Sequence, residues 1–293
     1  MNILVAFDKK YMPHTKVMLT SLRASMPDEK IDVYYLYNEI SPKILTKITK
    51  DLKRKNNINF YPIKIEKTPF DGVKIGMHFT IEIMYRLMAV ALLPQSVDRV
   101  LWLDGDIIVN HSIAEFYNVD FKEATIVACK GRGLIENHNR RLDLPKEHIY
   151  FNSGVLLMNL QKMRENKDLD RFINIMNTYG DRLTFVDQDI LNIAYTGKDV
   201  IYFDSAIYNC QIGRDFKLNK DQYHNFIEKC CIMHFAAAAK PWNNTYINGM
   251  EKLYWKYALM DHRYIEYIRF MLLAPVSSAY KRFRIRNMKQ YDF

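Results

Sequence analysis

The chain has 293 residues, a formal net charge of +9, 49% hydrophobic and 13% aromatic residues, and only 10 glycines and 9 prolines. This length suits one large α/β domain with an appendage or two small domains, and the composition excludes a largely disordered chain. Residues 1–7 lack the pattern of a signal peptide, and no apolar run reaches the roughly 18 residues of a membrane span. The positive charge predicts an anionic partner without identifying it.

Apolar runs alternate with helical periodicity along the first part of the chain. Residues 2–7 have the continuous apolar character of a central parallel strand. The expected elements after it are a helix over 13–26, a strand over 31–37, a helix opened by Ser41-Pro42, a strand over 58–63, a loop over 66–79, a helix over 80–93 and a strand that ends at Leu103. This order predicts an α/β fold with a mainly parallel, nucleotide-binding sheet.

The remainder of the chain adds strands, helices and a basic end. We expect strands over 124–128, 151–158, 200–203 and 230–235, and helices over 160–179 and 187–196. The cysteines form no Cys-x-x-Cys pair, and Cys230 and Cys231 are expected on opposite faces of a strand as small hydrophobic residues. Because the sequence from Gly249 onward looks helical and then basic, we divide the chain into a catalytic domain, 1–248, and an extension, 249–293.

The strand over 99–103 runs directly into Asp104-Gly105-Asp106. Carboxylates two positions apart in extended backbone leave the same edge of the chain, and Gly105 permits a turn and the close approach of a ligand. Two hard oxygen ligands at a strand end suit Mg²⁺ or Mn²⁺ carrying a diphosphate. An aspartyl-phosphate phosphatase also carries Asp-x-Asp after a strand. Ile108 and the long region before the motif argue against that enzyme class.

Polar residues at three other places each have a structural and a ligand-binding interpretation. Asp8, followed closely by Tyr11, either caps a helix or contacts a base or ribose. Arg86 either covers apolar surface with its stem or directs its guanidinium at a diphosphate or at the acidic pair. Asn152 and Ser153 either satisfy loop backbone or bind sugar hydroxyls.

Two motifs in the second half extend the candidate site. Asp187-Gln188-Asp189 opens a predicted helix, and two acids around an amide exceed what capping requires, so a sugar-binding role is plausible. His234 ends a predicted strand and is either structural or a third metal ligand; an imidazole ligand suits Mn²⁺ better than Mg²⁺. Lys240 would then place a point charge beside a phosphate.

With these motifs the chain resembles glycosyltransferase family 8, a retaining family with the GT-A fold that includes bacterial lipooligosaccharide galactosyl- and glucosyltransferases and glycogenin. The resemblance runs from residue 2 to about residue 245. The matching segments are the strand that ends at Asp8, Tyr85-Arg86-Leu87, Leu101 to Asp106, Tyr150 to Leu160, Asp187 to Asn192, and His234 to Trp242.

The resemblance implies a role for each matched position. It implies that Asp104, Asp106 and His234 bind Mn²⁺ and that the donor is a UDP-sugar. The further implied contacts are Lys240 with the diphosphate, Ala6 and Asp8 with uracil and ribose, Arg86, Asn152 and Asp187 with the donor sugar, and Gln188 beside the anomeric carbon. Two positions depart from the family pattern: Ala237 replaces a usual glycine, and Lys130 follows Cys129 where relatives often carry an acid.

We therefore expect a metal-dependent retaining transferase that moves glucose or galactose from UDP to a glycan, such as lipopolysaccharide or another cell-surface glycan. Gln188, Asp187 and Lys240 are its expected catalytic residues. Because an amide such as Gln188 is a weak nucleophile and the pattern does not single out Asp189 as a stronger one, attack from the leaving-group face is favoured. Two alternatives stay open, a glycogenin-like self-glucosylating protein and a non-catalytic nucleotide-sugar binder. A nucleotidyltransferase is disfavoured because residues 6–16 contain no glycine for a phosphate loop.

Residues 277–293 combine aromatic side chains with Lys and Arg near helical spacing. This pattern is typical of a helix on an anionic membrane surface, and a solvated tail or a packed helix is the alternative. Nucleic-acid binding has no other support in the chain. The expected location is the cytoplasm, at the inner face of the membrane.

Overall fold

A computed structural model describes residues 1–72, 80–133, 135–213, 218–243, 247 and 249–275. The end of the predicted loop, 73–79, and the predicted membrane-binding tail, 277–293, lie outside these residues.

A seven-stranded sheet forms the centre of the molecule, with strand order β3-β2-β1-β4-β7-β6-β8. The strands are β1 (Asn2–Ala6), β2 (Ile31–Tyr37), β3 (Ile58–Lys64), β4 (Arg99–Leu103), β6 (Ile126–Lys130), β7 (Phe151–Asn159) and β8 (Val200–Phe203). Neighbouring strands are parallel except at β7, which runs antiparallel to both β4 and β6. The predicted α/β fold with a mainly parallel sheet is confirmed.

A smaller sheet of β5 (Ile107–Val109), β10 (Ile232–His234) and β9 (Cys210–Gln211) lies beside the end of β4. The helices are α1 (Met12–Ser25), α2 (Pro42–Asn56), η1 (Ile81–Met88), α3 (Ala89–Leu92), α4 (Ala114–Asn118), α5 (Ile135–Arg141), α6 (Leu160–Glu165), α7 (Asp168–Tyr179), η2 (Gly180–Arg182), α8 (Val186–Ala194), η3 (Gly197–Asp199), α9 (Ser205–Tyr208), α10 (Lys220–Lys229) and α11 (Glu251–Met260). Residues 264–275 form one more helix after α11.

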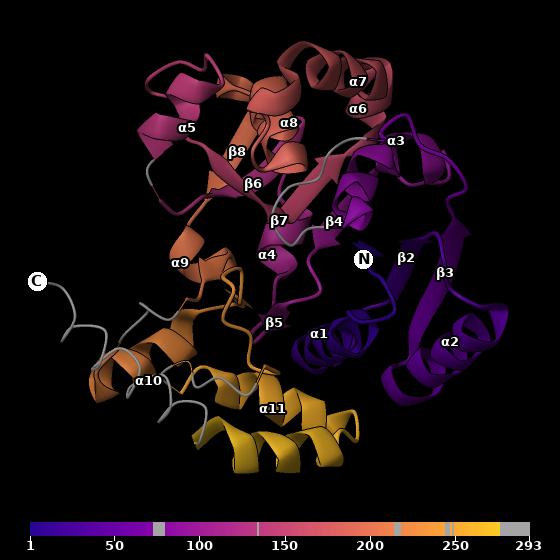
Figure 1. Cartoon of the computed structure of the whole chain (residues 1–293), viewed down its shortest axis with the longest axis vertical. Helices are drawn as coiled ribbons and strands as arrows, with labels where there is room; N and C mark the ends of the chain where they lie inside the picture. Colours follow the sequence, from indigo (N-terminus) through magenta and orange to yellow (C-terminus); the bar gives the residue numbers. More distant parts are fainter. Residues whose placement is uncertain (73–79, 134, 214–217, 244–246, 248, 276–293) are drawn as a thin grey trace, which may run out of the picture.

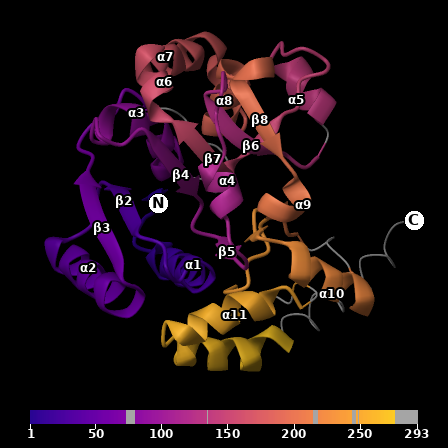
Figure 2. The same cartoon turned by 180° about the vertical axis from the view of Figure 1, so that it is seen from behind.

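Both faces of the sheet are buried at its centre, which explains the continuous apolar runs in β1 and β4. Ile3 and Val5 of β1 pack on one face with α1 and α2, and Leu4 packs on the other with η1, α3 and α6–α8. A third cluster joins the small sheet to α10 and α11. Figures 1 and 2 show α11 and the helix 264–275 at one end of the long axis, with α6 and α7 at the opposite end.

The structure corrects several predicted elements. The helix predicted over 80–93 is mostly a 3₁₀ helix, η1. The helix predicted over 160–179 is divided into α6 and α7, because Lys167 adopts positive φ between them. The strand predicted over 230–235 begins only at Ile232, so Cys230 caps α10 and is buried while Cys231 is partly exposed. Cys129 and Cys210 are also buried. Within the described residues, no helix has both the length and the apolar character needed to span a membrane.

Candidate metal and donor site

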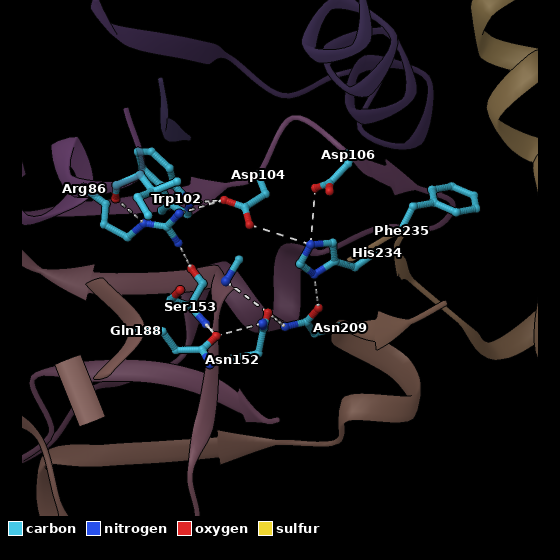
Figure 3. A network of polar contacts seen from close by, with 12 residues as sticks. Arg86, Trp102, Asp104, Asp106, Asn152, Ser153, Gln188, Asn209, His234 and Phe235 are labelled. Atoms are coloured by element: carbon cyan, nitrogen blue, oxygen red, sulfur yellow. Dashed lines mark hydrogen bonds and ion pairs between the residues drawn. The ribbon is translucent and has the colours of Figure 1, made fainter. Parts of the chain in front are cut away.

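Three predicted metal ligands meet at the junction of the two sheets. Asp104 and Asp106 follow β4, and His234 ends β10, which pairs with β5 so that His234 lies opposite Ile107. His234 Nε2 lies 3.2 Å from Asp106 Oδ1 and 3.6 Å from Asp104 Oδ2. Figure 3 shows both carboxylates directed toward the imidazole.

The geometry of this triad fits one divalent cation. One ligand atom from each side chain lies within 4.8 Å of the others, and the set combines two carboxylates with an imidazole. Both side-chain types bind first-row divalent metals, and imidazole favours Mn²⁺ over Mg²⁺. Each carboxylate also has its second oxygen occupied elsewhere, as described next, so each offers one oxygen to the ion.

Lys240 lies beside the second acid of the triad. Its Nζ donates to Asp106 Oδ2 and to the Phe235 carbonyl, at 2.5 Å in both cases. Burial opposes the ionisation of Asp106, but the positive charge of Lys240 and its hydrogen bond, aided by the neighbouring His234 ring, outweigh burial and hold the pKa of Asp106 well below the usual range. Asp106 is therefore a carboxylate at neutral pH, paired with the ammonium group of Lys240.

Arg86 and Trp102 hold the first acid of the triad. Asp104 Oδ1 accepts from Trp102 Nε1 at 2.7 Å and from Arg86 Nη2 at 3.0 Å, which leaves Oδ2 facing His234. The guanidinium is 3% exposed and lies over the Trp102 ring. Of the two interpretations of Arg86, the one that directs it at the acidic pair is confirmed.

Arg86 also contacts the start of α8. Its Nε lies 3.1 Å from Asp187 Oδ2, and Ser153 Oγ donates to the same oxygen at 3.0 Å. Asp187 is 5% exposed, and burial raises its pKa to about 6, although Arg86 opposes the shift.

This raised pKa predicts a pH-dependent stability. The folded state binds a proton at Asp187 more tightly than the unfolded state, whose value is 3.8, so the free energy of unfolding falls as pH rises from about 4 to beyond about 6. The total effect is about 3 kcal/mol. Asp187→Asn removes the titrating carboxyl group. The difference in unfolding free energy between wild type and this variant should therefore change by about 3 kcal/mol as pH rises through this range. Urea denaturation at a series of pH values measures it. A constant difference would contradict the assignment.

The amide of Gln188 is fixed at both ends. Its Oε1 accepts from Asn152 Nδ2 at 2.9 Å and from the Ser153 backbone N at 3.1 Å. Its Nε2 donates to the Tyr150 hydroxyl at 3.1 Å. Asn152 and Ser153 begin β7, which runs antiparallel to β4, so the start of β7 and the end of β4 share one edge of the sheet.

Asp189 lies behind Gln188 and is fully buried. Its oxygens accept two hydrogen bonds from Arg141 at 2.9 Å, one from Tyr150 at 2.6 Å and one from the Phe185 backbone N at 2.8 Å. All of these donors hold the carboxylate in place. Asp189 is therefore an anchor for Tyr150 and the start of α8 and does not face the site as a nucleophile.

The other residues predicted to bind the donor have no described hydrogen bond to this network. Asp8 Oδ1 accepts from the Tyr11 backbone N at 2.8 Å, but α1 begins at Met12 with Tyr11 as its N-cap and without a side-chain capping hydrogen bond, so Asp8 orders the turn before α1 and does not cap the helix. Ala6 ends β1. Gly105 packs against α1, where an added Cβ would lie 2.5 Å from Thr15 Oγ1. Ala237 is exposed in a bend. The roles of these residues toward a nucleotide stay predictions.

Three residues of the network were not predicted: Trp102, Tyr150 and Asn209. Trp102 had a signal, because it stands two positions before Asp104 in a buried strand and an indole N–H needs a partner there. Tyr150 and Asn209 had none, since a tyrosine before a strand and an asparagine in a turn are ordinary.

The absence of a side chain at Gly154 provides the space that Asp104 and His234 occupy. A Cβ at this position would lie 2.6 Å from Asp104 Oδ2 and closer still to His234 Cε1. We expect Gly154→Ala to displace both ligands and to weaken the binding of Mn²⁺ by about 10–100-fold. Calorimetric titration with Mn²⁺ measures the change, and thermal unfolding checks that the variant is folded. An unchanged affinity in a folded variant would contradict the proposed ligand set.

Comparisons with known proteins give a family match and several relatives. The sequence matches the family model described as Glycosyl transferase family 8 over residues 2–246. Glycosyltransferase GlyF of Streptococcus pneumoniae serotype 4 is 26% identical over 92% of this chain, and the chain spans 64% of GlyF. The lipopolysaccharide 1,2-glucosyltransferase of Escherichia coli K12 is 24% identical over 88% of this chain and 77% of its own length.

A solved structure shares the fold. The galactosyltransferase LgtC, in complex with donor and acceptor sugar analogues, superimposes with a TM-score of 0.75 at 24% identity, over 88% of this chain and 95% of LgtC. The GT-A type of fold predicted from the sequence is confirmed by this match.

Proposed function

The chain belongs to glycosyl transferase family 8, and we propose that it is a retaining enzyme that transfers glucose or galactose from UDP to a glycan acceptor. The observation that carries the proposal is the convergence of Asp104, Asp106 and His234 with Lys240 on one side and Gln188 on the other. The named activities of relatives, a lipopolysaccharide glucosyltransferase and a galactosyltransferase, support hexose transfer to a cell-surface glycan such as lipopolysaccharide.

The proposed mechanism assigns leaving-group chemistry to the triad and Lys240. Asp104, Asp106 and His234 would hold Mn²⁺, which when bound would act as a Lewis acid and neutralise negative charge on the departing UDP. The Lys240 ammonium contacts Asp106, one of the three ligands, and would add electrostatic stabilisation to the same leaving group. The proposal assigns the donor-sugar contacts to Arg86 and Asp187, which form an ion pair beside Asp104.

Retention of configuration requires a protein nucleophile or attack from the leaving-group face. Gln188 Oε1 already accepts two hydrogen bonds, which lowers the electron density it can offer to an anomeric carbon. Asp189 is fully buried and saturated with donors. We therefore propose front-face attack, with Gln188 contributing a fixed amide dipole beside the reacting carbon.

UDP release tests the proposed activity without an acceptor, because slow transfer to water releases UDP. We expect Mn²⁺-dependent release from UDP-glucose or UDP-galactose, and loss of release when a chelator is added. Binding of a UDP-hexose without any release would instead favour a non-catalytic binder. A mass increase of the intact protein by hexose units would favour the self-glucosylating alternative.

We also propose that the C-terminal region holds the enzyme at an anionic membrane surface on the cytoplasmic side. Residues 277–293 carry five Lys or Arg against one Asp. The preceding helix, 264–275, exposes an apolar face in which Ile265 is 81% and Leu272 67% exposed. A basic segment next to an exposed apolar helical face is the combination that favours interfacial binding.

Co-sedimentation with vesicles tests this placement. The full chain should bind vesicles that contain phosphatidylglycerol more strongly than neutral phosphatidylcholine vesicles. Ile265→Ser together with Leu272→Ser should weaken that binding, whereas Ile149→Ser, at an exposed site elsewhere, should not. Equal binding to both vesicle types, or none to either, would contradict the proposal.

A further inference from the structure

A chain of side-chain amides connects the metal ligand His234 to Gln188, and its direction is fixed by the backbone. Gly154 N donates to Asn152 Oδ1 at 3.0 Å, and Ser153 N donates to Gln188 Oε1 at 3.1 Å. Because a backbone N–H can only donate, these contacts identify the oxygen of each amide. Asn152 must therefore use its Nδ2 to donate to Gln188.

The same reasoning extends to the metal ligand. Asn152 Oδ1 also accepts from Asn209 Nδ2 at 2.9 Å, so the oxygen of Asn209 faces the opposite way, 2.9 Å from His234 Nδ1. An amide oxygen only accepts, and His234 Nδ1 must therefore carry a hydrogen. The lone pair of the neutral ring is then on Nε2, the atom that faces Asp104 and Asp106. Figure 3 shows this continuous path from His234 through Asn209 and Asn152 to Gln188.

Burial makes the path dependent on Asn209. Asn209 is fully buried and His234 is 2% exposed, so bulk water cannot replace the amide. The backbone places it there, since Asn209 lies between α9 and β9, and β9 pairs with β10 so that Gln211 lies opposite His234.

We propose that Asn209 is a positioning residue with two separate tasks. Its oxygen holds His234 in the tautomer that binds a metal, and its Nδ2 orients Asn152 and through it Gln188. This inference rests on the proposed transferase function, and it adds a physical connection between the metal ligands and the amide expected beside the anomeric carbon.

Two substitutions at this one position separate the tasks. Asn209→Asp keeps an acceptor for His234 Nδ1 but loses the donor to Asn152, so Mn²⁺ should bind no more weakly than to wild type while kcat for UDP release falls about tenfold or more. Asn209→Leu loses both contacts, so its Kd for Mn²⁺ should rise about 10–100-fold as well. Tyr150→Phe removes the acceptor at the far end and should lower kcat without changing the Kd for Mn²⁺.

Mn²⁺ titration by calorimetry and UDP-release kinetics are the two readouts, and Asn174→Asp, on the exposed face of α7, is the matched control. Equal losses of Mn²⁺ affinity in Asn209→Asp and Asn209→Leu, or wild-type kcat in Asn209→Asp, would overturn the proposal. If Asn209→Leu does not fold, Asn209→Asp alone decides, because a weaker Mn²⁺ affinity than wild type, or a wild-type kcat, in this variant would overturn the proposal. Absence of Mn²⁺-dependent UDP release in wild type would refute the transferase function instead, and the Mn²⁺ affinities would still test the tautomer.

Discussion

Asp104→Asn is expected to lower Mn²⁺-dependent UDP release by about 10³-fold. The reason is that the surrounding donors fix the orientation of the new amide group. Trp102 and Arg86 both donate to Asp104 Oδ1, so the asparagine oxygen must take that place and its NH₂ group must point toward His234. A donor then occupies the position of a metal ligand, and the variant should lose metal affinity together with turnover.

UDP release at saturating UDP-hexose, and Mn²⁺ titration of the same preparation, measure the two losses. Asp181→Asn is the matched control, because Asp181 is exposed and lies in η2, outside the site network. Turnover of Asp104→Asn within tenfold of wild type would show that this acid is not a metal ligand in the reaction.

Arg86→Met is expected to have the largest effect on stability. The guanidinium is nearly inaccessible and contacts Asp104, Asp187 and the backbone oxygens of Ile83 and Ser153. Removing it leaves the buried Asp187 carboxylate without its ion-pair partner, which costs about 3–5 kcal/mol of unfolding free energy. Urea denaturation at pH 7 measures the loss.

A second substitution separates lost pairing from lost packing. Asp187→Asn in the Arg86→Met background removes the unpaired charge and should restore part of the stability, so the two effects should not add. Arg86→Lys should fall between wild type and Arg86→Met, because an ammonium cannot reproduce the guanidinium fork. A loss below 1 kcal/mol in Arg86→Met would contradict this account.

Local sequence signals predicted the strands and the acidic pair because each depends on neighbouring residues. The strands β1 and β4 contain continuous apolar runs that are buried on both faces, and Asp104 and Asp106 follow β4 directly. The antiparallel direction of β7 had no such signal, since its residues are as apolar as those of a parallel strand. The 3₁₀ geometry of η1 and the break at Lys167 likewise depend on tertiary packing rather than on periodicity.

A site residue could be predicted where its side-chain type and its local sequence were sufficient. It could not be predicted where its role depends on a contact with a residue that is distant in the sequence. Arg86 had two interpretations in the sequence, and only its contact with Asp104 decides between them. Asp189 looked like a possible nucleophile until Arg141 and Tyr150 were seen to occupy it. Asn209 gave no signal because its importance comes from His234 and Asn152, which are distant in sequence.

The junction between the two sheets also has a consequence for the order of folding events. Asp106 and Lys240 are 134 positions apart, and β10 reaches the acidic pair only by pairing with β5. Contacts across such long loops require a large loss of chain entropy before they form, so the complete ligand set exists only in the finished fold. An ion that needs all three ligands stabilises the native state but not the folding transition state. In stopped-flow experiments Mn²⁺ should therefore slow unfolding and lengthen the lifetime of the native protein, while the refolding rate stays the same.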